Sequence, residues 1–372
     1  MSRRTVLGGS ALLAAATKAE TSERRVQFTG DGLGLSPVEY ARLLAKLAEE
    51  GKIKPDSYSN EGAVAELEAA FASELGKERA VFLPTGTLAN HLAVRLLAGN
   101  DRKVLIQRQS HLYNDCGDCC QTLSGLTLVP LGADRAAFTL EEVEEHVRRA
   151  EGGRVAAPVG VISIESPVRR KSGEMFDYAE MKRIAAYARR RGIRLHLDGA
   201  RLYLASAYTG VAVGEYAGLF DTVYVSLYKY FNAASGAILA GPRKLLDPLY
   251  HTRRMFGGGL NQVWPFAAVA RHYHQGFGER YQGAVRASEE LLRRLGADRR
   301  FRVERVPQGS NIVALEVRTG DPKSFQKKLR AAGVVVRALE PRGEGARLLL
   351  TVNETVVRRP VEELAGLFRE AV

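Results

Sequence analysis

Short apolar runs alternate with helical patterns over most of the chain. Between the runs, apolar residues recur every three to four positions, as in 62–75 and 178–188, which is the spacing of one helix face. The runs are continuous and rich in β-branched residues, which is typical of strands buried on both faces. Their alternation with helices predicts an α/β fold built on a mostly parallel sheet. The runs cover residues 79–83, 104–106, 159–165, 193–197 and 223–227.

The pattern changes near Arg300, after a long helical stretch over 263–295. The order becomes strand, strand, helix, strand, strand, helix, which predicts a compact α+β domain. These elements are expected at 301–306, 311–317, 322–332, 334–339, 347–352 and 360–368. We therefore expect three parts in a chain of this length. They are a lead-in over 1–25, an N-terminal arm with a large domain over 26–295, and a small C-terminal domain over 296–372.

Two chemically active side chains follow neighbouring runs. Asp198 comes directly after the run that ends at Leu197, and Lys229 lies just beyond the run that ends at Leu227. Because parallel strands present their carboxyl ends at one edge of a sheet, both side chains should reach the same site. A lysine that forms a Schiff base and a carboxylate that keeps a pyridinium nitrogen protonated are what pyridoxal phosphate (PLP) needs. The pair therefore predicts a PLP site.

A glycine-containing turn leads into a predicted helix that starts near residue 88. Gly86 and Thr87 lie at its N-terminus, where unpaired N–H groups and the positive end of the helix dipole favour phosphate. Ser226, three residues before Lys229, offers a further hydroxyl. These three residues are the expected phosphate contacts of the cofactor.

Three segments resemble one family, the low-specificity L-threonine aldolases or aromatic amino acid β-eliminating lyases. They are residues 196–203 (HLDGARLY), 83–90 (LPTGTLAN) and 255–259 (MFGGG). The resemblance runs from about Val26 to the C-terminus. It implies a fold-type-I, PLP-dependent transferase-like fold, with a mostly parallel seven-stranded sheet, one strand near 236–239 of opposite direction, and a smaller C-terminal α+β domain. It also implies a homodimer or homotetramer that acts on a small-molecule amino acid.

The same resemblance implies a reaction and individual roles. The reaction is retro-aldol cleavage of a β-hydroxy-α-amino acid such as threonine to glycine and an aldehyde, carried out by a carbon–carbon lyase. An imidazole stacked on the cofactor ring, a contact to the ring's phenolic oxygen, and a guanidinium that holds the substrate carboxylate complete the site. These roles are implied for His111, Arg201 and Arg347, beside Lys229 and Asp198.

Two positions depart from the family pattern. Residues 30–32 (GDG) stand where the family has Ser-Asp-Thr, so a substrate-binding hydroxyl is absent. Val168 stands near the family histidine that handles the β-hydroxyl proton, and valine carries no base. Another PLP reaction, such as β-elimination, is therefore an alternative. A non-catalytic basic binding protein is a further alternative, although the intact pair of Asp198 and Lys229 argues against it.

Charge and the first residues bear on partners and location. The formal net charge is +12 at pH 7, but the arginines are scattered along predicted helices, so we expect no nucleic-acid partner. No apolar run is long enough to span a membrane. Arg3 and Arg4, followed by a small and apolar run, resemble a twin-arginine export signal. A periplasmic or exported location is expected, with the cytoplasm as the alternative.

Three cysteines, Cys116, Cys119 and Cys120, lie within five residues. Neither a second cysteine pair nor a histidine pair at zinc spacing accompanies them, so we expect no metal. Packing as small side chains is the expected role. In an exported protein, a disulfide between Cys116 and Cys119 is the alternative.

Overall fold

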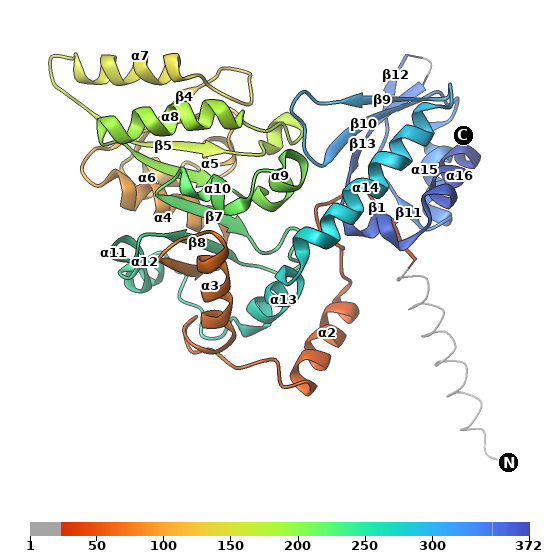
Figure 1. The fold of residues 1–372 in the computed structure, drawn as a ribbon, viewed down its shortest axis with the longest axis horizontal. Coiled ribbons are helices and arrows are strands. Elements are labelled where there is room, and N and C mark those ends of the chain that lie inside the picture. The colour runs from red at the N-terminus through yellow and green to blue at the C-terminus, as the bar shows by residue number, and fades with distance from the viewer. Residues whose placement is uncertain (1–23, 344) are drawn as a thin grey trace. The chain divides into compact units, whose positions relative to one another are not determined.

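The structure is a computed structural model that describes residues 24–343 and 345–372 (Figure 1). Its chain divides into two compact units. Among the described residues, the larger comprises 35–278 and 306–310, and the smaller comprises 24–34, 279–305, 311–343 and 345–372. Arg3 and Arg4 lie outside the described residues, so the export signal stays a prediction. No helix of the described part is long and apolar enough to cross a membrane.

A seven-stranded sheet forms the centre of the larger unit, in the order β2-β8-β7-β6-β5-β3-β4. Only the pairs that include β8 are antiparallel, and the other neighbours are parallel. The predicted fold class, including the reversed strand, is therefore confirmed. The strands are β2 (Arg79–Leu83), β3 (Lys103–Gln107), β4 (Thr127–Leu131), β5 (Val159–Glu165), β6 (Arg194–Asp198), β7 (Thr222–Ser226) and β8 (Ala237–Gly241).

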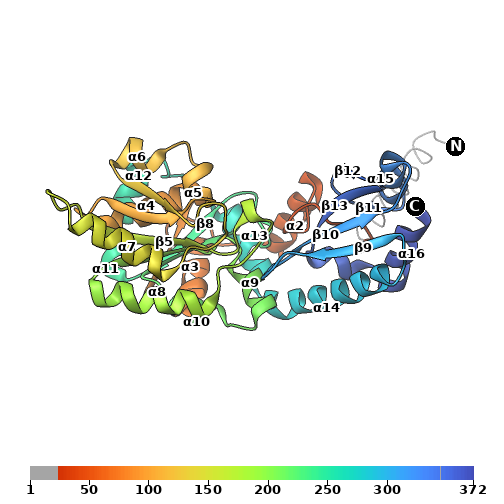
Figure 2. The ribbon, with the colours of Figure 1, turned by 90° about the horizontal axis from the view of Figure 1, so that it is seen from above.

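Helices cover both faces of this sheet, and Figure 2 shows α4 and α8 on opposite sides of β5. α4 begins at Gly86 because the Thr85 side chain accepts a hydrogen bond from the Leu88 N–H. α8 ends before Gly192, which adopts the left-handed conformation that closes a helix. The helices of the larger unit are α2 (Pro37–Glu49), α3 (Gly62–Glu74), α4 (Gly86–Ala98), α5 (His111–Asn114), α6 (Cys119–Ser124), α7 (Leu140–Glu151), η1 (Arg169–Lys171), α8 (Tyr178–Arg191), α9 (Leu202–Thr209), α10 (Val213–Gly218), α11 (Arg243–Leu246), α12 (Leu249–Met255) and α13 (Trp264–His274).

The smaller unit has a four-stranded antiparallel sheet, β12-β13-β10-β9, and a separate parallel pair, β1-β11. Its strands are β1 (Val26–Gln27), β9 (Phe301–Arg305), β10 (Ile312–Val317), β11 (Val334–Val335), β12 (Glu340–Arg342) and β13 (Gly345–Thr351). Its helices are α15 (Pro322–Ala331), η2 (Glu354–Arg358), α16 (Val361–Ala371) and nearly all of α14 (Phe277–Gly296). The expected strand over 334–339 is thus much shorter, because β11 pairs with β1 instead of joining the larger of the two sheets.

Two expected boundaries differ from the structure. The helical stretch over 263–295 is two helices, α13 and α14, since Gly276 between them adopts a positive φ of 66°. The domain boundary, expected after residue 295, lies instead near the start of α14, because the two units divide between Gly278 and Glu279. Pairing of β1 with β11, and hydrogen bonds from Asn353 and Thr355 to the Gln27 backbone, assign the segment before Gly34 to the smaller unit. Contacts this distant along the chain leave no local pattern in the sequence.

Candidate active site

Asp198 and Lys229 come from neighbouring strands to the same edge of the sheet. Asp198 ends β6, and the parallel register places it beside Tyr224 of β7. Lys229 follows the end of β7 by three residues. The charge of Asp198 acts on Lys229, so the structure brings the carboxylate and the amine together.

Asp198 is buried, and each of its carboxylate oxygens accepts a hydrogen bond. Asn90 Nδ2 donates to Oδ2 at 2.6 Å, and the Ala200 N–H donates to Oδ1 at 3.1 Å. Asn90 Oδ1 faces His196 Nε2 at 2.9 Å, and His196 Nδ1 lies 2.9 Å from Thr222 Oγ1. Since Asn90 Oδ1 can only accept, His196 Nε2 carries the proton. The four side chains form one chain of hydrogen bonds that orients Asp198.

His196 is neutral in this chain because burial lowers its pKa to about 4. A charged imidazole would carry protons on both nitrogens, and Thr222 could then no longer donate to Nδ1. The neutral form therefore fixes one direction for every hydrogen bond that leads to Asp198.

The Lys229 amine is held by an aromatic neighbour and by opposing charges. Burial, followed by the positive charge of Arg201, lowers the pKa of Lys229, while Tyr228 and Asp198 oppose this shift. Nζ donates a hydrogen bond to the Tyr228 hydroxyl at 3.2 Å and lies 4.5 Å from the centre of that ring. A lowered pKa leaves a larger fraction of the amine unprotonated, which is the form that reacts with an aldehyde.

The expected phosphate contacts lie at the N-terminus of α4 and the end of β7. A side chain on Gly86 would overlap the hydroxyl of the buried Tyr224, so only glycine lets the α4 terminus approach β7. The Ser226 Oγ is buried and has no hydrogen-bond partner among the described residues. A buried hydroxyl in need of a partner fits a phosphate oxygen well. Together with Asp198 and Lys229, these donors fit PLP.

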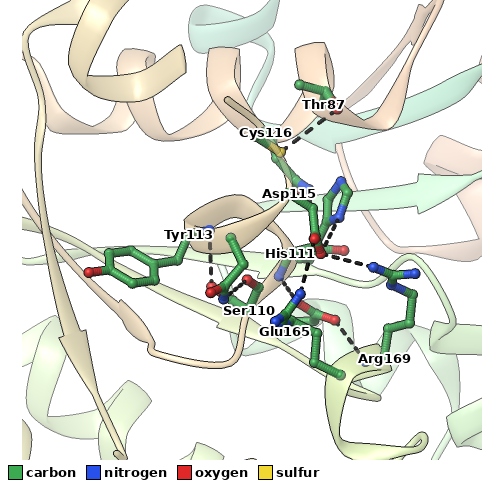
Figure 3. A network of polar contacts seen from close by, with 12 residues as sticks. Thr87, Ser110, His111, Tyr113, Asp115, Cys116, Glu165 and Arg169 are labelled. Atoms are coloured by element: carbon green, nitrogen blue, oxygen red, sulfur yellow. Dashed lines mark hydrogen bonds and ion pairs between the residues drawn. The ribbon is translucent and has the colours of Figure 1, made fainter. Parts of the chain in front are cut away.

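His111 lies in a network of polar contacts at the start of α5 (Figure 3). Its Nδ1 is 3.3 Å from Asp115 Oδ2, and Asp115 is also paired with Arg169 at 3.0 Å and Arg170 at 3.2 Å. A hydrogen bond with Cys116 is the main cause that raises the pKa of His111. The Cys116 thiol also lies 3.8 Å from Thr87 Oγ1, so the Cys116 side chain touches both predicted site residues, His111 and Thr87.

Glu165, at the end of β5, connects His111 to the segment that follows this strand. One carboxylate oxygen accepts the His111 N–H at 2.5 Å, and the other accepts the Arg169 N–H at 3.0 Å. Glu165 is paired in register with Asp198. Burial, and then the Asp198 charge, raise the pKa of Glu165 to about 7.

Val168 is fully buried, and its backbone is fixed by hydrogen bonds with the far side of the same turn. Its N–H donates to the Glu174 carbonyl at 2.8 Å, and its carbonyl accepts from the Gly173 N–H at 3.0 Å. The side chain is therefore part of the core. Near the place where the family has a histidine, this chain has an apolar contact and a run of basic residues, Arg169 to Lys171.

Arg347 belongs to β13 of the smaller unit. Its register partners are Glu316 on β10 and Glu340 on β12, and its Nε lies 3.7 Å from Glu304. Glu304 is thus the carboxylate that the structure places beside the guanidinium. Its role as the clamp of a substrate carboxylate stays a prediction.

Comparison with known proteins identifies the family. The sequence profile of β-eliminating lyases matches residues 46–325. The chain belongs to the β-eliminating lyase family. A low-specificity L-threonine aldolase of Saccharomyces cerevisiae is 30% identical to this family member over 229 residues, which are 61% of this chain and 58% of the relative. The chain thus spans less than two thirds of the length of that relative.

Two further proteins widen the comparison. An alanine racemase of Cochliobolus carbonum is 30% identical over 294 residues, which are 76% of this chain and 74% of the relative. A solved structure from Exiguobacterium, whose proposed assignment is aromatic amino acid β-eliminating lyase or threonine aldolase, is 26% identical with a TM-score of 0.76. That alignment covers 95% of this chain and 99% of the other.

Several site residues of this β-eliminating lyase family member carry no sequence signal of their own. Asn90 and His196 look like ordinary members of a helix and a strand, and Glu165 looks like a strand end. Asn90 does lie inside the segment 83–90 that resembles the family, so its polar side chain on an apolar helix was the one available hint. Within the described residues, His, Cys, Asp and Glu form no group that could hold a metal, and the three cysteines are free thiols. Cys116 and Cys120 pack in a hydrophobic cluster with residues of α4 and β3.

Proposed function

We propose that this chain is a PLP-dependent lyase that cleaves a threonine-like β-hydroxy-α-amino acid to glycine and an aldehyde. The observation that carries the proposal is the convergence of Asp198 and Lys229 at neighbouring strand ends in a chain of this family. Relatives named low-specificity L-threonine aldolases support the choice of reaction.

The residues divide into those that hold the cofactor and those that hold the substrate. The cofactor, when bound, supplies an electron sink for the pair left on Cα as the Cα–Cβ bond breaks. Lys229 binds its aldehyde, and Asp198 keeps a proton on its ring nitrogen, which the hydrogen bond from Asn90 favours by stabilising the ionised carboxylate. The α4 terminus at Gly86 and Thr87 and the Ser226 hydroxyl bind its phosphate.

Three further residues complete the proposed site. His111 stacks on the ring, and Arg201 contacts the ring's phenolic oxygen. Arg347 binds the substrate carboxylate, for which a planar guanidinium is suited. Each of these roles rests on the family resemblance.

A second reaction, β-elimination, is favoured by one observation. Elimination of a good leaving group at Cβ requires no base for a β-hydroxyl proton, and the buried Val168 supplies none. A third outcome, exchange or inversion at Cα, is tested because one relative is named an alanine racemase.

A substrate panel on the purified, PLP-loaded protein separates these reactions. Threonine and allo-threonine are assayed for glycine and acetaldehyde, a β-chloro amino acid for pyruvate and ammonia, and L-alanine for loss of optical activity. We expect glycine and aldehyde from the β-hydroxy substrates. Pyruvate formation without glycine formation would replace the aldolase by the eliminating enzyme, and racemisation alone would replace both.

Assembly and location complete the proposal. We propose a homodimer or homotetramer, which sedimentation of the loaded protein measures, and export through the twin-arginine route. The assembly rests on the family resemblance, and export rests on the residues around Arg3 and Arg4.

A further inference from the structure

Tyr228 has an unexplained position next to the reactive lysine. Its side chain is 45% exposed, so core packing does not account for an aromatic residue at this point of the chain. Its hydroxyl accepts the hydrogen bond of Lys229 Nζ at 3.2 Å. In the bend that follows β7, the Tyr228 ring lies 4.5 Å from the amine of its sequence neighbour.

The expected bases for aldol cleavage are absent or engaged elsewhere. Retro-aldol cleavage removes the proton of the β-hydroxyl, and a base must lie within hydrogen-bond reach of that oxygen. Val168 is apolar and buried. The His111 ring is tied to Asp115 through Nδ1 and to Cys116, and Asp115 is itself shared with two guanidiniums.

The chemistry of the substrate places its β-oxygen near Tyr228. In a β-hydroxy-α-amino acid this oxygen lies three covalent bonds from the amino nitrogen, a span similar to a hydrogen bond. With the cofactor bound, the substrate nitrogen would replace Lys229 Nζ, and the released Lys229 amine would remain beside it. A phenol oxygen 3.2 Å from Nζ would then lie within two hydrogen-bond spans of the β-oxygen, and rotation about the Cα–Cβ bond would bring the two oxygens together.

We infer that Tyr228 is a catalytic residue whose phenolic oxygen takes the β-hydroxyl proton of the substrate and passes its own proton to Lys229. This inference rests on the proposed aldol cleavage and names the base for it. Tyr228 and Lys229 would thus perform the proton transfer that the family assigns to a histidine near the position of Val168.

The proton and electron movements balance within this pair. The substrate O–H proton moves to Tyr228 Oη while the Tyr228 proton moves to the free Lys229 amine. The O–H electron pair becomes the second bond of the aldehyde carbonyl, and the Cα–Cβ pair stays with Cα. The Lys229 ammonium then returns one proton to Cα, which gives glycine and restores both side chains.

The charges around Lys229 suit this exchange. Burial and Arg201 favour the neutral amine, which can receive a proton, while Tyr228 and Asp198 favour the ammonium, which can give one. The net effect is a lowered pKa of Lys229, so its amine can receive the proton from Tyr228 and its ammonium can readily give one up.

The test compares Tyr228→Phe, which keeps the ring and removes the hydroxyl, with Tyr178→Phe as a matched control. Tyr178 also has a lysine over its ring, Lys182 at 5.0 Å, but it lies on α8, away from Lys229. In the PLP-loaded protein we measure threonine cleavage, and in parallel the exchange of the glycine α-protons in D₂O. The exchange involves Lys229 and the cofactor but no β-hydroxyl.

We expect Tyr228→Phe to lower kcat for threonine cleavage by about 10²–10⁴-fold, the range of a positioned acid or base. Glycine exchange should remain close to the wild-type rate, and Tyr178→Phe should leave both reactions unchanged. Tyr228→His, which restores a base, should recover part of the cleavage.

A further measurement uses the cofactor-free protein. The pH dependence of Lys229 labelling by an amine reagent, followed by peptide mass spectrometry, gives the pKa of this amine. Loss of the Tyr228 hydroxyl should move the midpoint to lower pH, since the hydroxyl favours the ammonium. An unchanged midpoint would show that the contact does not exist in solution.

Other outcomes overturn the inference in distinguishable ways. Undiminished cleavage by Tyr228→Phe would remove Tyr228 from the reaction while the proposed function stands. Equal losses of cleavage and exchange would assign Tyr228 to Lys229 or the cofactor instead of the β-oxygen. A wild-type protein that exchanges glycine but leaves every β-hydroxy substrate intact would reject the proposed function, and the assignment of Tyr228 with it.

Discussion

Two regions of the site differ in how closely their residues match the family pattern. The first is the pair of strand ends at Asp198 and Lys229, and the second is the segment over 165–174. At the first, the residues that a PLP ring requires come together, and a chain of hydrogen bonds through Asn90 holds the carboxylate. At the second, the side chain of Val168 belongs to the core, and the neighbouring arginines are paired with Asp115.

The difference separates two tasks of the site. Electron withdrawal by a bound cofactor depends on the first region, and handling of the substrate's own protons depends on the second. A chain can retain the first task while another residue takes over the second. Glu165 is one link between the two regions, since it is paired in register with Asp198 and bonded to the His111 and Arg169 N–H groups. A substitution that disturbs one region should therefore leave the task of the other largely intact.

The largest effect is expected from Asp198→Asn. An amide cannot keep the ring nitrogen protonated, so turnover should fall by about 10⁴-fold, the upper end of what one positioned proton-holding group contributes. Kinetics of the loaded variant measure this loss, and circular dichroism checks that the fold survives.

Asp221→Asn is the control for this change. The Asp221 carboxylate accepts the Leu195 N–H at the opposite end of β6, so the variant keeps the site intact. Near-normal turnover of Asp198→Asn would remove Asp198 from its proposed role.

Glu165→Gln tests the connection between the two regions through pH. The folded pKa of Glu165, about 7, lies above its usual value of 4.5, so the folded state keeps a proton that the unfolded chain releases. This contribution to stability is complete below pH 4.5 and is lost as the pH rises through 7. The difference between 7 and 4.5 corresponds to a contribution on the order of 3 kcal/mol.

Glutamine has no proton to lose, so the variant should lose less stability than the wild type between pH 4.5 and 7. Urea unfolding of the cofactor-free protein across this window measures the difference. Glu174→Gln, a change in the same segment, should keep the wild-type dependence. Parallel curves for the wild type and Glu165→Gln would show that the carboxyl ionises normally in the folded protein.

Asn90→Leu tests the support of Asp198 at nearly constant side-chain volume. The change leaves Asp198 Oδ2 and the His196 Nε2–H without their partner, and a buried unsatisfied polar group costs about 1–3 kcal/mol. We expect lower stability in urea and weaker PLP binding by fluorescence titration.

His91→Leu separates these two consequences. His91 is the next residue on α4 and is equally buried, but its Nε2 contacts Ser124 at 2.7 Å. The His91→Leu variant should be less stable than the wild type but should bind PLP with the same affinity. Equal affinities of Asn90→Leu and His91→Leu for PLP would mean that Asn90 contributes to the stability of the fold but not to PLP binding.

The two regions also differ in how much of them the sequence reveals. Asp198 and Lys229 could be placed because apolar runs mark strand ends, and parallel strand ends meet. The contact between Asn90 and Asp198 could not be predicted, because it depends on how α4 is rotated against the sheet. The leucines of α4 indicate only which face of the helix is apolar. The contact between Tyr228 and Lys229 could not be predicted either, since it depends on the backbone conformation of the bend after β7.

For the segment over 165–174, the sequence predicts only that it departs from the family pattern. The sequence shows that Val168 replaces a base, but whether its side chain enters the site or the core depends on backbone hydrogen bonds across the turn to Glu174 and Gly173. The assignment of the N-terminal segment to the smaller unit could not be predicted either. It depends on the pairing of β1 with β11, which are separated by some 300 residues of sequence.

The smallest effect on catalysis is expected from Val168→His. Because Val168 is fully buried and its backbone is held on both sides, an imidazole introduced there points into the core and reaches no substrate. It should cost about 1–3 kcal/mol through burial of a polar group without a partner, and threonine cleavage should stay near the wild-type rate. Val161→His, on the buried strand β5, is the control for the loss of stability alone. If Val168→His instead raised cleavage tenfold or more at unchanged stability, the side chain would have reached the β-hydroxyl. The segment over 165–174 would then be as close to the family in function as the strand ends are, and Tyr228 would no longer be needed as the base.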